Sequence, residues 1–134
     1  MDPVLERRLA SAEVLWLTTV DGDSQPQTSP VWFTWDDGAF HVASEPTAAK
    51  VANVVARPRV SVHLDDAGPG ALVVTVEGRA SVSSDGLEPE IAARYVAKHG
   101  EGFRRLETTA AGYLARFSVG LRVEPTRWRV FPST

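Results

Sequence analysis

Three polar side chains that could hold an anion recur along residues 46–57 (PTAAKVANVVAR). On a helix with about 100° per residue, Lys50, Asn53 and Arg57 fall within roughly 60° of arc, while valines and alanines occupy the other side. A phosphate group needs fixed donors and positive charge, and this row supplies both. Lysine is otherwise rare in the chain, with only Lys98 besides. The pattern favours an anion-binding face, and a solvated surface face is the alternative.

The elements that would position this face are short strands in hairpin order, with helices between them. Hydrophobic alternation and turn residues predict strands at 14–20, 27–35, 39–43, 60–64 and 72–82, with one or two more within 117–131. Caps and breakers predict helices at 3–12, 46–57 and 88–99, the last closed by Gly100, and further helix within 101–115. Pro30 indicates a sheet edge or a bulge, and Gly78 a bulge or a barrel corner.

This order of elements predicts a mainly β fold of about six antiparallel strands with flanking helices. A closed or nearly closed barrel is the economical arrangement, because it removes exposed strand edges. An OB-fold, a lipocalin-like cup and a split barrel all satisfy the pattern.

Length and composition bound the class of protein. The 134 residues fit a single domain over 1–134. Cysteine is absent, which excludes disulfides, thiolate metal sites and a cysteine nucleophile. No signal-like apolar segment or membrane-length apolar run is present, so we expect a cytoplasmic protein without a membrane partner. The net charge of −3 argues against a nucleic-acid partner.

The remaining chemistry-bearing residues have structural explanations. The histidines lack metal-ligand spacing, so we expect no metal site. The Asp-Asp pairs at 36–37 and 65–66 adjoin glycine-containing turns, and no catalytic acid, base or nucleophile is evident. Trp32 and Trp35 cannot both face the core together with Val31, so at least one of them lines a groove or a subunit interface.

The order WLTTVDGDSQPQTSPVWF, DDG, AAKVANVVARPRVSVHL and VTVEGRASV resembles the pyridoxamine 5′-phosphate oxidase-like split-barrel superfamily. It is more closely similar to the actinobacterial flavin/deazaflavin oxidoreductases that depend on coenzyme F420. The resemblance covers residues 10–83 well and the remainder loosely. The block from Lys50 to Ser61 (KVANVVARPRVS) is fairly specific, although no single element of it is.

The resemblance implies an FMN-binding-protein-like split barrel that forms a homodimer, with a small-molecule cofactor in a groove at the dimer interface. It implies that Lys50 contacts the cofactor phosphate, with Asn53 and Arg57 beside it. The strand segment that would run along the ring system and offer backbone groups is Thr28, Ser29, Pro30, Val31 and Trp32.

Departures from the oxidases themselves bear on the activity. Those enzymes carry an Arg on the second strand and an Arg-Lys pair at the start of the helix. Here no Arg occurs between Asp21 and Ala56, and Ala49 precedes Lys50. Val73-Val74 stands where the oxidases place a Gln. These losses argue against pyridoxamine phosphate oxidation and favour F420 over FMN.

The resulting expectation is an F420-dependent oxidoreductase that transfers a hydride to a small-molecule acceptor. Two alternatives stay open: an FMN-binding oxidoreductase of the same fold, and a non-catalytic module that binds a cofactor or a tetrapyrrole.

Overall fold

The computed structural model describes residues 1–134 and contains seven strands and four helices. In chain order they are α1 (Pro3–Ser11), β1 (Val14–Val20), β2 (Pro26–Trp32), β3 (Thr34–Asp36), β4 (Ala39–Ser44), α2 (Ala49–Ala56), β5 (Arg59–Leu64), β6 (Leu72–Ser83), α3 (Pro89–Arg105), α4 (Ala110–Arg116) and β7 (Val119–Pro132). No helix combines the length and the apolar character needed to cross a membrane.

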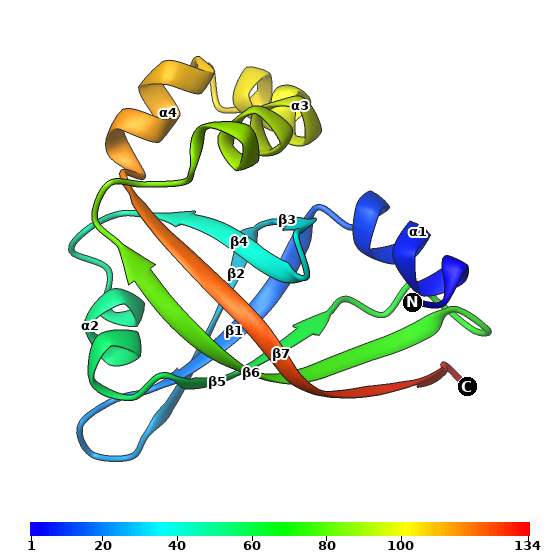
Figure 1. The fold of residues 1–134 in the computed structure, drawn as a ribbon. Helices are drawn as coiled ribbons and strands as arrows, with labels where there is room; N and C mark the ends of the chain where they lie inside the picture. Colours follow the sequence, from blue (N-terminus) through cyan, green and yellow to red (C-terminus); the bar gives the residue numbers. More distant parts are fainter.

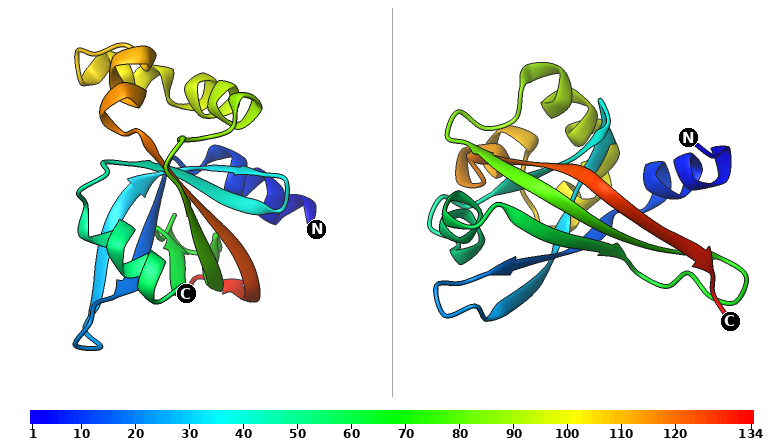
Figure 2. Two further views of the ribbon diagram at one scale, coloured as in Figure 1. Left: turned by 60° about the vertical axis from the view of Figure 1, so that its left-hand side comes forward. Right: turned by 60° about the horizontal axis from the view of Figure 1, so that its bottom comes forward.

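The strands form one antiparallel sheet in the order β2-β1-β5-β6-β7-β4-β3. The sheet curls on itself into a partly closed barrel (Figures 1 and 2). Alternate residues of β1, β5 and β6 face its interior, and β4 is buried along its whole length. Branched aliphatic and aromatic side chains fill this interior. The largest of these fully buried side chains are Leu15, Leu17, Phe33, Phe40, Val42, Val62, Val74, Val76 and Leu121.

The longest ladder pairs β6 with β7 from Leu72↔Pro132 to Ser83↔Gly120. Its register shifts between Glu77 and Gly78, which confirms the bulge predicted at this glycine. A Cβ at position 78 would lie 2.8 Å from the Glu124 carbonyl oxygen, so only glycine allows β7 to approach here. The segment between β6 and β7 carries α3 and α4, which cover one end of the barrel (Figure 1).

The predicted strand 27–35 is two strands, β2 and β3, and this break accounts for the seventh strand. Phe33 leaves the ladder between them. Its amide donates to the Glu13 carbonyl (3.3 Å), and its carbonyl accepts from His99 Nε2 (2.8 Å). The edge that Pro30 indicated is confirmed, since β2 is an outer strand bonded to β1 alone.

The predicted helix 46–57 was too long at both ends, because α2 spans 49–56. Ala48 stands at its N-terminal cap, and no side chain caps the helix. Ser44 belongs to β4, where it pairs with Val119. The chain therefore needs residues 45–48 to turn from the strand into the helix.

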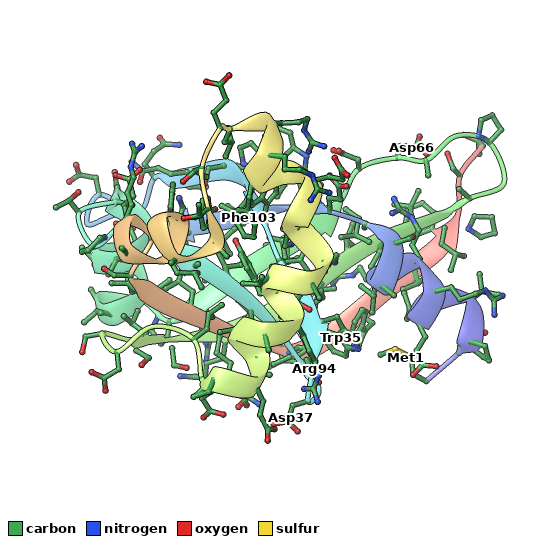
Figure 3. All side chains as sticks on the ribbon, turned by 90° about the horizontal axis from the view of Figure 1, so that it is seen from above. Met1, Trp35, Asp37, Asp66, Arg94 and Phe103 are labelled. Carbon is green, nitrogen blue, oxygen red and sulfur yellow. The ribbon has the colours of Figure 1, made fainter.

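The predicted helix end at Gly100 corresponds to a kink at His99 (φ −104°, ψ 16°). The chain does not leave the helix there, because helical backbone resumes beyond the kink and α3 continues to Arg105. The imidazole of His99 is buried and bonded to Phe33, which holds the helix against the sheet through the kink. Figure 3 shows α3 crossing above the sheet, with Phe103 near α4.

Candidate cofactor-binding cleft

Lys50 lies in the first turn of α2 and is half-buried. Its ammonium group makes no hydrogen bond and no ion pair within the chain. Burial lowers the pKa of Lys50 from its ordinary value, and the nearby charge of Glu45 acts in the opposite direction. A partly desolvated cation without a partner gains from an anion that binds beside it.

Lys50 borders a cleft of about 400 Å³, within the roughly 300–1,000 Å³ typical of small-molecule sites. The cleft lies between the start of β1, the end of β2, the end of β4, α2 and α4. Most of the residues that line the cleft are apolar. The full lining is Val14, Pro30, Val31, Trp32, Ala43, Ser44, Glu45, Ala48, Lys50, Leu106, Tyr113 and Phe117.

One wall of the cleft is a stack of aromatic rings. Trp32 lies 5.2 Å from Tyr113, with 26° between the ring planes, and Tyr113 lies 4.2 Å from Phe117, with 18° between them. Behind Trp32, His99 stacks at 5.0 Å and 7°. Because the rings stack on one another, they form a rigid apolar wall for the cleft.

Sequence analysis missed Tyr113 and Phe117. Their spacing of four residues was the available signal, because it places both rings on one face of a helix. Which surface that face would meet could not be predicted, since α4 and β2 lie about 80 residues apart in the chain. The expectation that Trp32 or Trp35 lines a groove is confirmed for Trp32.

Four of the eight predicted site residues line the cleft: Lys50, Pro30, Val31 and Trp32. Pro30 is exposed on the outer strand β2, whose far side has no neighbouring strand. Backbone carbonyls on that side are therefore available to a ligand.

Asn53 and Arg57 are bonded within the chain instead. The buried Asn53 amide donates to Thr19 Oγ1 (3.0 Å) and to Gln27 Oε1 (2.9 Å). Arg57 Nε donates to the Val20 carbonyl (2.7 Å). Both side chains attach α2 to the β1–β2 hairpin. Of the three polar side chains predicted to bind an anion, only Lys50 therefore lies at the cleft.

Thr28 and Ser29 lie further along β2, outside the cleft lining. The Thr28 hydroxyl lies 2.7 Å from that of Thr18 on the outer face of the barrel. Ser29 pairs with Leu17 in the β1–β2 ladder and is half-buried.

Three side chains that can ionise border the cleft: Lys50, Glu45 and Tyr113. Glu45 forms an ion pair with Arg116 (3.4 Å). Burial raises the pKa of Tyr113, which keeps its hydroxyl protonated. The cleft therefore combines an apolar, ring-lined slot with one free cation.

The curled seven-stranded sheet with helices at its end is a split β-barrel, and comparisons with known proteins agree. The pyridoxamine 5′-phosphate oxidase family profile matches residues 1–131, so the chain belongs to that family. No curated protein matches the chain by sequence.

Solved structures share the fold at low sequence identity. The conserved hypothetical protein Rv2991 from Mycobacterium tuberculosis has a TM-score of 0.75 at 21% identity, over 98% of this chain and 85% of that one. An F420 reductase has a TM-score of 0.69 at 22% identity, over 92% and 94% of the two chains. The haem storage protein HutZ from Vibrio cholerae has a TM-score of 0.69 at 20% identity, over 98% and 93%.

Proposed function

We propose that this chain is an oxidoreductase that binds coenzyme F420 in the cleft beside Lys50 and transfers a hydride to a small-molecule acceptor. The observation that carries the proposal is the unpartnered ammonium of Lys50 at the border of an apolar, ring-lined slot. Membership of the pyridoxamine 5′-phosphate oxidase family and the fold shared with an F420 reductase support it.

The residues of the cleft fit an anionic cofactor with a flat ring system. Lys50 would hold the phosphate group. Trp32, Tyr113 and Phe117 would pack against the ring and exclude water. The free edge of β2 at Pro30 would offer backbone carbonyls to the ring.

When bound, the reduced cofactor supplies the hydride, and the protein supplies binding and orientation. No histidine lines the cleft, and Glu45 is held by Arg116. The chain's own residues would therefore position the reactants and keep water out, without a dedicated side chain to move a proton.

We also propose that the cleft is completed by a second copy of the chain. It is open beside the free edge of β2, where an exposed Pro30 borders it. Light scattering at micromolar concentration should give the mass of a dimer, and a monomeric mass would contradict this part of the proposal.

A non-catalytic module that binds a tetrapyrrole is the second candidate. The apolar aromatic wall and the fold shared with HutZ favour it. The absence of histidine from the lining counts against it, because imidazole is the usual ligand of haem iron.

A side-by-side fluorescence titration of the purified protein with F420 and with FMN tests the assignment, and haem serves as a third ligand. We expect F420 to bind more tightly than FMN or haem, and added acceptors then to reoxidise the reduced cofactor. Preference for FMN would indicate an FMN-dependent oxidoreductase in place of an F420-dependent one. Preference for haem, without turnover, would favour the second candidate.

A further inference from the structure

A second cleft lies on the outer face of the barrel, and residues of β1, β2, β5, β6 and β7 line it. Its volume is about 470 Å³, and its lining shares no residue with the cofactor-binding cleft. The lining residues are Thr18, Val20, Pro26, Arg59, Val60, Ser61, Glu77, Gly78, Arg79 and Thr126. In Figure 1, β5 lies at the opposite end of the barrel from α3 and α4, and β6 rises from that end towards α3.

Two neighbouring arginines line this cleft. Arg59 on β5 and Arg79 on β6 are direct cross-strand partners, and both are exposed. Like charges in this arrangement repel each other and destabilise the sheet. Neither guanidinium forms an ion pair or a hydrogen bond within the chain.

Two carboxylates stand close to the arginine pair, yet each has another partner. Glu77 lines the cleft and forms an ion pair with Arg129. Glu124, the neighbour of Arg79 on β7, forms an ion pair with Arg122. Neither carboxylate forms an ion pair with Arg59 or Arg79, so both guanidinium groups keep their donors free.

Hydroxyl groups complete the lining. Ser61 lies next to Thr18 on the adjacent strand, and its hydroxyl makes no hydrogen bond within the chain. The guanidinium groups of Arg59 and Arg79 and the hydroxyl of Ser61 supply donors that match the oxygens of a phosphate group. Arginine in particular binds phosphate through paired donors. A carboxylate offers fewer acceptor oxygens to the same set of donors.

We propose that this cleft is an anion site, distinct from the cofactor-binding cleft, that takes the phosphate or diphosphate group of a small molecule between Arg59 and Arg79. The volume exceeds what a single phosphate needs, so the group is expected to be part of a larger ligand or a diphosphate. The proposal does not depend on the identity of the cofactor.

Calorimetric titration with inorganic pyrophosphate at fixed ionic strength tests the site. Arg59→Gln and Arg79→Gln should each weaken binding by about tenfold or more, because each removes a charge-assisted contact. The control Arg7→Gln, which makes the same charge change at an exposed position on α1, should leave binding unchanged.

Thermal unfolding gives a second readout, which shows whether a variant that fails to bind is still folded. Without ligand, Arg59→Gln and Arg79→Gln should raise the melting temperature, because the repulsion is removed. At the same concentration, pyrophosphate should raise the melting temperature of the wild type more than that of either variant. Failure of the wild type to bind pyrophosphate, or binding by both variants that is as tight as that of the wild type, would overturn the proposal. Tighter binding of citrate than of pyrophosphate would overturn the assignment to phosphate.

Discussion

Gly102 of α3 lies directly against the indole ring of Trp32, so closely that a Cβ at position 102 would overlap the ring. This contact sets the height of α3 above β2, and Trp32 forms part of the cleft wall on its other side. The shape of the cleft therefore depends on the absence of a side chain at a residue that does not line it.

Gly102→Ala should destabilise the protein by about 1–3 kcal/mol, because the added methyl group overpacks this contact. Gly100→Ala is the matched control on the same helix, since nothing lies within 4 Å of a Cβ at that position. It should leave stability unchanged or raise it by up to about 1 kcal/mol. Urea unfolding of both variants checks this, and equal effects would contradict the proposed contact.

Asn53→Ala should cost about 1–3 kcal/mol, because it leaves the buried Thr19 hydroxyl without its partner. Gln27→Ala removes the exposed end of the same network and should cost less than about 1 kcal/mol. If Asn53 only attaches α2 to the β1–β2 hairpin, the cofactor affinity of the folded Asn53→Ala variant should stay within about twofold of that of the wild type. A large loss of affinity without loss of stability would instead return Asn53 to the binding site.

Tyr113→Leu should weaken cofactor binding by about three- to tenfold, because it keeps the apolar volume and removes the stacking ring. Tyr113→Phe retains the ring and loses only the hydroxyl that lies 3.4 Å from that of Tyr95. It should bind almost as well as the wild type. Equal losses in the two variants, measured by fluorescence titration, would show that the hydroxyl matters and the ring does not.

Lys98 should make stability depend on pH in the alkaline range. Burial lowers the pKa of Lys98 to about 8, with the charge of Glu13 opposing the shift. In the unfolded chain the lysine keeps a pKa near 10.4, so above pH 8 the unfolded state binds more protons and folding becomes more favourable as pH rises.

Urea unfolding at pH 7.5 and at pH 9.5 measures this effect. The stability of the wild type relative to Lys98→Met should be greater at the higher pH. The comparison cancels other groups that titrate in both proteins. A constant difference between the two proteins would mean that the Lys98 ammonium is not desolvated in the folded state.

Local patterns predicted the fold well where neighbouring residues determine the structure. The helix predicted at 3–12 is α1, which Asp2 caps, and Gly78 marks the predicted bulge in β6. The errors in the predicted element boundaries arose where a contact between residues far apart in the chain determines the structure. The carbonyl of Phe33 is drawn from the ladder by His99, 66 residues further along the chain.

The site shows the same division. The helical wheel grouped Lys50, Asn53 and Arg57 on one face, but Arg57 lies just beyond the end of α2. The wheel could not show that the β1–β2 hairpin lies against Asn53 and Arg57. The aromatic wall was missed because Tyr113 meets Trp32 only after α4 packs over the end of the barrel. Periodicity identifies which residues share a face and does not identify what that face meets.

The measurement that tests the central claim most directly is the dissociation constant of F420 for the wild type, Lys50→Ala and Arg7→Ala, by fluorescence titration. If Lys50 anchors the cofactor phosphate, Lys50→Ala should bind F420 more than about tenfold more weakly, while Arg7→Ala should match the wild type. Unchanged affinity in Lys50→Ala would contradict the placement of the cofactor in this cleft.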